Sequence, residues 1–440
     1  MKGFGPETWS WMSYDFANSA FATSITAVIF NQYYAGVIAG GAQGTDFSLL
    51  GYNFNLPGAT MFQMSVLLGT TLTVILSPLI GVFADLKGNK KKLLIVMVII
   101  GSLCTAALAF LKPGDVLQGW FIYGVALCMF LLALNLYNAF LPQIASPKNI
   151  GLISGFSWAI GYLGGGGCLL LNLIMLQNPQ ALGFEEGELG ISHVILTVAA
   201  WWLLFSLPTF WGVRERPARK EVLGQPVKFG QILKNLRKTF QETRKYKQLW
   251  VFLIAYFFFT NGIETTISSA SIFGAEELHM DTSSLIMLFL VVQFTAFPGA
   301  ILFGILVDKL GNKKALSIAL FFWIVALAFV YQLGIFWDPV TEFYMAAVLV
   351  GLVMGGSQAA ARSLFASFTP PSRSAEFFSF YGVAGRLASM LGPLSFAAVN
   401  IITRSLRHSV VAMVIFFIIG LLILLRVDEE EGRRAAEQAE

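Results

Sequence analysis

The chain has 440 residues, of which 56% are hydrophobic and 12% are charged, and its formal net charge is +4. This apolar content exceeds what one water-soluble core of that length can bury, so lipid must form part of the solvent. The composition therefore excludes an ordinary soluble protein. We interpret the modest positive charge as a sign of membrane topology and not of nucleic-acid binding.

Apolar runs of membrane-spanning length recur from one end of the sequence to the other. One crossing of the hydrocarbon layer needs about 20 mostly apolar residues. In the first half we predict spans at residues 6–35, 59–83, 93–111, 118–142, 150–176 and 190–212. In the second half we predict spans at residues 249–273, 283–307, 315–335, 342–366, 376–400 and 406–426. The predicted fold is therefore an all-α membrane protein with twelve transmembrane helices.

These spans divide the chain into four predicted parts. They are an N-terminal six-helix bundle at 1–212, a basic linker at 213–248, a C-terminal six-helix bundle at 249–428 and a charged tail at 429–440. The first apolar run carries Asp15 and lacks a basic flank followed by a small-residue cleavage site. We therefore expect this run to remain in the mature protein as a helix and not to act as a signal peptide.

Basic residues concentrate on one side of the predicted spans. Eleven of the 29 Lys and Arg residues lie within 213–248, four more follow Asp85 and three follow Asp308. The exceptions are Lys112, Arg404 and Arg407. By the positive-inside rule, both termini and the linker are predicted to be cytoplasmic. The linker itself is either an amphipathic helix on anionic lipid or a solvated connector.

The two halves of the sequence repeat each other. GVFADLKGNKKKL, which begins at Gly81, matches GILVDKLGNKKAL, which begins at Gly304, and this alignment pairs Asp85 with Asp308. An even number of spans separates equivalent helices, so the halves are predicted to be parallel repeats related by an axis along the membrane normal. That arrangement places a binding site between the halves, near the membrane midplane.

Several motifs resemble those of known transporters. The loop G-x-x-x-D-x-x-G-N-K-K, present twice, resembles the signature of the major facilitator superfamily. WMSYDFANSAF from Trp11, LYNAFLP from Leu136, SGFSWAIGYLGG from Ser154 and GGSQAAARSLFASFTPPSRSAEFFSFYG from Gly355 resemble the bacterial "unknown major facilitator" family, which is related to the fungal vacuolar effluxer of amino acids. The resemblance covers essentially the whole chain. It implies a proton-linked or facilitative carrier of small solutes in the cell membrane, with amino acids as the leading substrate class.

Two predicted helices each carry a stripe of small polar residues. The stripes are Asp15, Asn18, Ser19 and Ala22 in the first span, and Asn261, Glu264, Thr265 and Ser268 in the seventh. Both follow the i, i+3, i+4, i+7 spacing of one helix face. Ionisable groups are costly inside a membrane, so Glu264 and Asp15 are candidates for proton coupling. We expect the stripes to face a central cavity, where Asp15, Asn18, Asn261 and Glu264 contact substrate. The alternative is that they hydrogen-bond neighbouring helices, at about 0.6 kcal/mol per bond.

Further polar residues lie within the predicted spans. Arg386 lies well inside the eleventh span, where its guanidinium cannot easily reach water, so it faces either a substrate carboxylate or a structural acid. The family often has lysine at this position, so substrate identity does not carry over from it. Asn138, Gln358 and Arg362 occupy neighbouring positions in the two repeats. We predict that Asn138 and Gln358 bind substrate, and that Arg362, near the cytoplasmic end, acts in gating or structure.

Asp85 and Asp308 are predicted gating residues. Each is followed by glycine and lysine, where a carboxylate can cap the N-terminus of a helix in the other half. The resemblance implies that these contacts hold the cytoplasmic side shut in the outward-open state and that breaking them permits rocking. The alternative is that both residues only shape tight turns and set topology.

Other functional classes find less support. A membrane enzyme would show a clustered motif such as H-E-x-x-H or G-x-S-x-G, and the sequence has none. Cys104, Cys128 and Cys168 stand singly, without the spacing of a disulfide framework or zinc site, so we expect no metal and no cofactor. The remaining alternatives are a channel, an exporter of amphipathic drugs or lipids, and a membrane nutrient sensor. We expect a monomer that contacts membrane lipids, a small-molecule substrate and, for coupled transport, protons.

Overall fold

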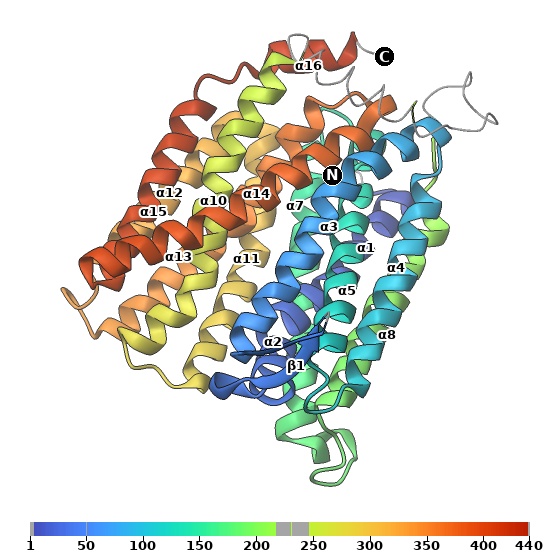
Figure 1. Cartoon of the computed structure of the whole chain (residues 1–440). Coiled ribbons are helices and arrows are strands. Elements are labelled where there is room, and N and C mark those ends of the chain that lie inside the picture. The colour runs from blue at the N-terminus through green and yellow to red at the C-terminus, as the bar shows by residue number, and fades with distance from the viewer. Residues whose placement is uncertain (1–3, 50, 217–229, 231–245, 439–440) are drawn as a thin grey trace. The chain divides into compact units, whose positions relative to one another are not determined.

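The computed structural model describes residues 4–49, 51–216, 230 and 246–438 (Figure 1). Within these residues, eleven helices are long and apolar enough to cross a membrane. They coincide with the second to twelfth predicted spans, so the all-helical membrane architecture is confirmed. The count of twelve spans and the side of the termini stay predictions. Most of the predicted linker, including its candidate amphipathic helix, lies outside the described residues.

The helices and strands have the following bounds. The long helices of the first half are α3 Gly58–Lys87, α4 Lys90–Ala107, α5 Val116–Asn138, α7 Ile150–Gln177 and α8 Ile191–Gly212. Those of the second half are α10 Lys247–Glu276, α11 Thr282–Leu310, α12 Asn312–Tyr331, α13 Pro339–Ser367, α14 Ser374–Thr403 and α15 Leu406–Leu424. The short elements are α6 Leu141–Ile144, α16 Glu429–Glu437, η3 Gly41–Gln43, η4 Leu108–Phe110, η5 Pro179–Leu182, η7 Pro371–Arg373, β1 Thr45–Leu49 and β2 Tyr52–Leu56.

The first predicted span is a run of four helical segments. α1 Pro6–Ala20 leads into the π-helix η1 Phe21–Val28, and α2 Phe30–Tyr33 leads into the second π-helix η2 Tyr34–Ile38. α1 begins with a proline, whose missing amide hydrogen costs nothing in a first turn. Because α1 has only 15 residues, this run is not among the eleven long helices. Stretches of π-helix often mark functional sites.

Contacts between residues divide the chain into two compact units. Unit 1 comprises Met1–Pro78, Asn89–Tyr137 and Leu163–Glu215. Unit 2 comprises Leu79–Gly88, Asn138–Tyr162 and Arg216–Glu440. Unit 2 therefore contains the second half of the sequence together with two short pieces of the first half. One piece is the end of α3 with Asp85, and the other runs from the end of α5 to the middle of α7.

Both units have buried aromatic side chains in their interiors. In unit 1, Trp11 stacks on Tyr137 with 4.6 Å between ring centroids, and in unit 2, Trp323 stacks on Phe417 at 5.3 Å. By contrast, Leu103 in the spanning helix α4 is 63% exposed. Contact with water at such positions would be unfavourable, so we expect these helix faces to contact lipid.

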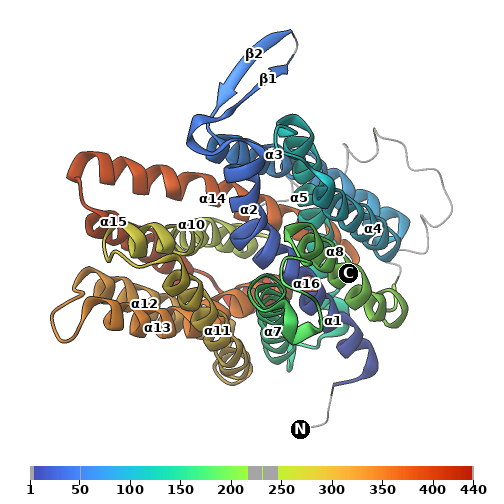
Figure 2. The same cartoon turned by 90° about the horizontal axis from the view of Figure 1, so that it is seen from below.

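The strands β1 and β2 form a two-stranded antiparallel sheet between the first helical run and α3. Its register pairs Phe47 with Phe54 and Asp46 with Asn55. Figure 2 shows that this hairpin extends sideways, beyond α2 and α3. The hydropathy pattern predicts only a loop here, because the stretch is too short and too polar for a span.

Shortly after the last spanning helix of each sequence half, a glutamate caps a helix of that half. In unit 1, Glu215 accepts a hydrogen bond from the Lys91 amide at 3.3 Å, at the start of α4. In unit 2, Glu429 accepts hydrogen bonds from the amides of Asn312 at 3.2 Å and Lys313 at 3.1 Å, at the start of α12. Carboxylates stabilise helix N-termini because they pair with free amides and with the positive end of the dipole. We call these contacts the terminal clamps.

The residue before each clamp glutamate binds the start of the same half. The Arg214 amide donates to Glu7 of α1 at 3.0 Å, and the Asp428 amide donates to Gln248 of α10 at 2.9 Å. Elements that the sequence alignment pairs thus make similar contacts, while the structural repeat itself stays a prediction. Burial raises the pKa of the first clamp carboxyl, Glu215, because lost hydration outweighs the hydrogen bonds from the amides.

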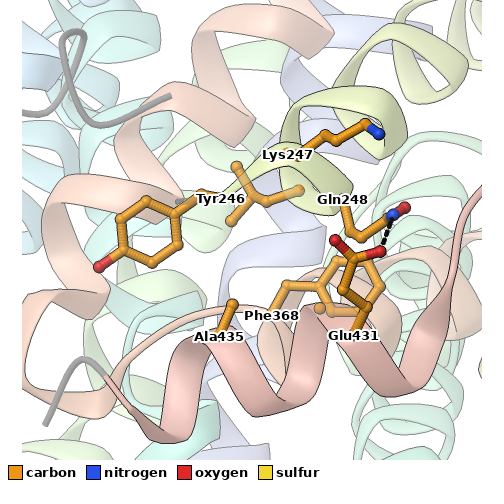
Figure 3. Close-up of a pocket in the computed structure, with 8 residues that line it drawn as sticks. Tyr246, Lys247, Gln248, Phe368, Glu431 and Ala435 are labelled. Atoms are coloured by element: carbon orange, nitrogen blue, oxygen red, sulfur yellow. Dashed lines mark hydrogen bonds between the residues drawn. The ribbon is translucent and has the colours of Figure 1, made fainter. Parts of the chain in front are cut away.

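The C-terminal helix α16 strengthens the second clamp. Gln248 donates from its amide nitrogen to Glu431 of α16 at 2.5 Å (Figure 3). Figure 3 also shows Phe368, from the end of α13, beside this pair. A Cβ added to Gly432 would lie 2.5 Å from the nearest atom of the Phe368 ring, so α16 approaches that ring as closely as a glycine permits.

We predict that Glu429→Ala lowers the melting temperature of the detergent-solubilised protein. The substitution removes the acceptor for two amides of α12, and loss of such a cap costs about 0.5–2 kcal/mol. The matched control is Glu430→Ala, because Glu430 pairs with Arg433 on the exposed side of α16. Tryptophan fluorescence during heating measures the melting temperatures of both variants. Unchanged melting of Glu429→Ala would remove the second clamp as a source of stability.

Candidate functional site

Asp15 lies inside unit 1, where an aromatic cluster holds it. Its side chain is 4% exposed, and its carboxylate accepts a hydrogen bond from the Tyr137 hydroxyl at 2.9 Å. The Trp11 indole donates to the Tyr137 carbonyl at 3.0 Å, which fixes that tyrosine at the end of α5. Asn18, one turn later, is also buried. The two predicted polar residues of α1 are therefore part of the interior of their unit.

Glycines of α7 allow the first helical run to approach closely. A Cβ added to Gly164 would lie 2.6 Å from the Phe16 Cα, and one added to Gly165 would lie 3.2 Å from the Ser19 carbonyl oxygen. Small residues at such crossings let helix backbones touch. Part of the α1 stripe, at Ser19, therefore faces α7.

The polar stripe of α10 divides into two sides. Asn261 and Thr265 are fully buried, and a Cβ added to Gly392 of α14 would lie 2.9 Å from the Thr265 Cβ. Within the described residues, neither polar atom of the Asn261 side chain has a hydrogen-bond partner. Glu264 is half-buried and Ser268 is exposed. The carboxylate thus lies on the accessible edge of the helix, and the amide packs against α14.

Glu264 on α10 and Arg386 on α14 lie near the same tyrosine. Both charges are within electrostatic range of the Tyr256 hydroxyl. A Cβ added to Gly385 would lie 3.1 Å from that hydroxyl, and Arg386 is the next residue of the same helix. In the part of the chain that the structure describes, neither charged group makes a side-chain hydrogen bond or ion pair. Two half-buried charges inside spanning helices are therefore available to a ligand.

Arg362 is buried in a polar network of unit 2. Its side chain is 1% exposed, and its guanidinium donates to the Ser154 hydroxyl at 3.0 Å and carbonyl at 2.8 Å. It also donates to the Asn138 side-chain oxygen at 3.2 Å and lies 5.2 Å from the centre of the Trp158 ring. Such contacts compensate a buried cation for lost hydration.

Gln358 extends this network by one turn of α13. It accepts a hydrogen bond from the Tyr162 hydroxyl of α7 at 2.5 Å. The Ser154 hydroxyl, also on α7, donates to the Ala359 carbonyl of α13 at 2.9 Å. The structure therefore brings three predicted site residues, Asn138, Gln358 and Arg362, into one set of contacts that joins α13 to α7.

Asp85 caps the start of α14. Its two carboxylate oxygens accept hydrogen bonds from the amides of Ala375 at 3.2 Å and Glu376 at 2.8 Å. One turn earlier, a Cβ added to Gly81 would lie 2.6 Å from the Ala375 carbonyl oxygen, so the two helices nearly touch. We call this contact the first latch.

Asp308 makes the equivalent contact with α7. Its carboxylate oxygens accept hydrogen bonds from the amides of Gly151 at 3.0 Å and Leu152 at 3.3 Å. A Cβ added to Gly304 would lie 2.9 Å from the Gly151 carbonyl oxygen. In this second latch, as in the first, a carboxylate from one sequence half caps a helix from the other half.

Several partners of these residues are not among the predicted site residues. They are Tyr137, Ser154, Trp158 and Tyr162. All four lie in the motifs LYNAFLP and SGFSWAIGYLGG, which were the available signal. Neutral Ser, Trp and Tyr side chains carry no charge that marks them inside a span. Within the described ranges, no group of three His, Cys, Asp or Glu side chains gathers to hold a metal ion.

Comparison with known proteins identifies relatives along the whole chain. The model of the family described as "Vacuole effluxer Atg22 like" matches residues 5–437. The chain is 30% identical to the "Uncharacterized MFS-type transporter YxiO" of Bacillus subtilis over 443 residues, which cover 100% of this chain and 98% of the relative. It is 24% identical to "Autophagy-related protein 22" of Saccharomyces cerevisiae (strain ATCC 204508 / S288c), across 86% of this chain and 79% of the relative.

Solved structures of low sequence identity share the fold. The proton:xylose symporter XylE, bound to 6-bromo-6-deoxy-D-glucose, matches with a TM-score of 0.74 and 13% identity, covering 99% of this chain and 98% of that one. A bacterial homologue of the iron transporter ferroportin in its outward-facing state matches with a TM-score of 0.69 and 13% identity, covering 96% and 99%. The family match covers nearly the whole chain and agrees with the paired latches and the polar residues within the spans. The chain therefore belongs to the Atg22-like vacuole effluxer family of major-facilitator-type membrane transporters.

Proposed function

We propose that the chain is a secondary transporter of the cell membrane that moves small solutes, amino acids first among them, by alternating access. The observation that carries this proposal is the pair of latches. Asp85 and Asp308 are equivalent in the two sequence halves, and each caps a helix of the opposite half. Such symmetric contacts suit a device in which two halves separate and rejoin.

The latches are weak enough to open in every cycle. A carboxylate at an accessible helix N-terminus contributes about 0.3–1 kcal/mol. Two of them bias a conformational equilibrium without locking it. By the positive-inside rule, the lysines that follow both aspartates support a cytoplasmic location for this end of the protein.

Arg362 forms a second layer of the proposed gate. Its bonds to Ser154 and Asn138 join α13 to residues of the first sequence half. Because a buried guanidinium must keep its hydrogen bonds, these helices separate only when water or substrate replaces them. Asn138 and Gln358 then become free to bind substrate.

Glu264 is the first candidate for proton coupling, and Asp15 is the second. Glu264 is half-buried and has no side-chain partner among the described residues, so a proton or a substrate cation can reach it. Asp15 already accepts a hydrogen bond from Tyr137 inside unit 1. Its protonation therefore requires that this aromatic cluster opens or that a proton passes through it.

Arg386 is proposed to bind the substrate carboxylate. A guanidinium recognises a carboxylate through two parallel hydrogen bonds, and Arg386 has no carboxylate partner in the described part of the chain. With Glu264 near the same tyrosine, the site offers both signs of charge. A zwitterionic amino acid carries both complementary charges.

We predict saturable amino-acid counterflow in proteoliposomes, and loss of its dependence on an imposed pH gradient in Glu264→Gln. The substitution keeps the size of the side chain and replaces the carboxyl group with an amide, which cannot bind and release a proton. The control is Glu276→Gln, an exposed acid at the end of the same helix. If Glu264→Gln kept both rate and pH dependence, Asp15→Asn would be the next variant. Absence of counterflow for the whole panel by folded protein would contradict the substrate class and favour a drug or lipid exporter or a sensor.

We predict that Arg386→Lys lowers the transport of amino acids more than that of the corresponding amines, which lack the carboxylate. A lysine keeps the charge but loses the two parallel hydrogen bonds to the carboxylate. The apparent affinity for amino acids should therefore fall by about ten-fold, and that for amines should not. Competition by amino acids and by amines against one labelled amino acid measures this. An equal loss for both ligand types would show that Arg386 has a structural role.

We predict that Asp85→Asn and Asp308→Asn each shift the conformational equilibrium away from the latched state by about two- to five-fold. Spin labels at Lys92 and Ser372, in a cysteine-free background, report the separation by double electron–electron resonance. The control is Asp338→Asn, because Asp338 caps its own helix through the Thr341 amide at 3.1 Å. If the aspartate variants and the control give the same distance distribution, the latches do not control opening.

A further inference from the structure

The hairpin of β1 and β2, here called the ribbon, has two chemically different faces. Opposed residues of an antiparallel pair point to the same side of the sheet. The register therefore places Phe47 and Phe54 on one face, together with Tyr52. The other face carries the pairs Asp46 with Asn55 and Ser48 with Asn53. The ribbon is thus amphipathic along its whole length.

The apolar face of the ribbon is open. Tyr52 is 71% exposed and Phe54 is 42% exposed, while the rings of Phe47 and Phe54 stack with 5.7 Å between their centroids. On the polar face, Asn55 donates to the Asp46 carboxylate at 2.8 Å. A single hairpin is only marginally stable in water, and an exposed aromatic face marks a surface that makes further contacts. This face needs an apolar contact.

The base of the ribbon is fixed at the edge of the membrane. β2 ends at Leu56, and the spanning helix α3 begins at Gly58. A Cβ added to Gly58 would lie 2.7 Å from the carbonyl carbon of Ala35, so the start of α3 is packed tightly on η2. The ribbon therefore leaves the protein where a span meets the water interface. From there it extends to the side, past α2 and α3 (Figure 2).

We propose that the ribbon is a lipid-binding surface that lies on the membrane with Phe47, Tyr52 and Phe54 in the boundary between headgroups and acyl chains. Aromatic side chains favour that boundary, because their rings are apolar and tolerate nearby polar groups. The residues from Thr45 to Leu56 contain one aspartate and no lysine or arginine. The ribbon therefore binds by apolar insertion, without attraction to anionic headgroups. By the predicted topology, it lies on the outer leaflet.

Spin labels on adjacent residues of opposite faces test this proposal in the full-length protein. Phe54→Cys and Asn53→Cys, in a background without the three native cysteines, are reconstituted into nanodiscs of phosphatidylcholine. We expect oxygen to relax the label at position 54 and a water-soluble nickel chelate to relax the label at position 53. Replacing about a third of the lipid by phosphatidylglycerol should change neither result. Equal access of the chelate to both labels would overturn the proposal. So would a label at 54 shielded from both reagents, which would indicate a protein partner or a second copy on this face.

Hydrogen exchange gives a second test that keeps the native cysteines. We expect amides of the ribbon to exchange about ten-fold faster in Phe54→Asp than in the wild type in the same nanodiscs, since a charge on the apolar face expels it from lipid. Asn53→Asp, one residue away on the polar face, should leave the exchange unchanged. Equal exchange in both variants would exclude membrane docking as the source of protection. Transport by both variants shows independently that the protein is folded.

Discussion

The bond between a carboxylate and the free amides of a helix start is the interaction on which much of this structure depends. Four helices begin with such a bond from elsewhere in the chain, made by Glu215, Glu429, Asp85 and Asp308. A helix N-terminus leaves four amides without partners within the helix, and a carboxylate from another element supplies some of the missing acceptors. The same solution appears in both sequence halves, at equivalent helices.

These four bonds differ in what surrounds them, and this difference is the basis on which we propose that the clamps are permanent and the latches reversible. Each clamp glutamate is followed or preceded by further contacts within its own half, such as Asp428 with Gln248. The latch aspartates instead join helices from different halves, where Gly81 and Gly304 bring the backbones together. In our proposal, similar hydrogen bonds therefore stabilise a bundle in one place and form a switch in another. The distinction depends on whether neighbouring contacts must break at the same time.

The sequence predicted the all-helical membrane architecture and the helix-capping contacts of Asp85 and Asp308, because both leave strong local signals, while the gating role of these two residues stays a prediction. Apolar length identifies spans, and the duplicated loop places Asp85 and Asp308 beside helix ends in either half. Other features leave no such signal. A π-helix such as Phe21–Val28 differs from an α-helix by one position in its hydrogen bonds, with no change in composition. The alternating pattern of the ribbon is visible only over ten residues, and hydropathy averaged over a span conceals it.

Sequence reasoning named the charged and amide residues of the candidate site, whose roles stay predictions, but it did not give their contacts. Helical spacing put Asn261 and Glu264 on one stripe, yet the packing of α14 at Gly392 buries the amide and leaves the carboxylate accessible. For Asp15, the decisive neighbour is Tyr137, which lies far away in sequence and has no charge. Pairings of this kind follow from tertiary contacts, which a periodicity argument along one helix does not contain.

The first terminal clamp also has a consequence for the order of events during synthesis. Its residues, from Glu7 to Glu215, all belong to the first half of the chain. Once this stretch has left the ribosome, the end of the sixth predicted helix can bind the starts of the first and third, before any of the second half exists. The nascent protein thus has a way to complete one bundle early and to hide its free helix ends. Insertion of the remaining spans then proceeds beside a finished neighbour.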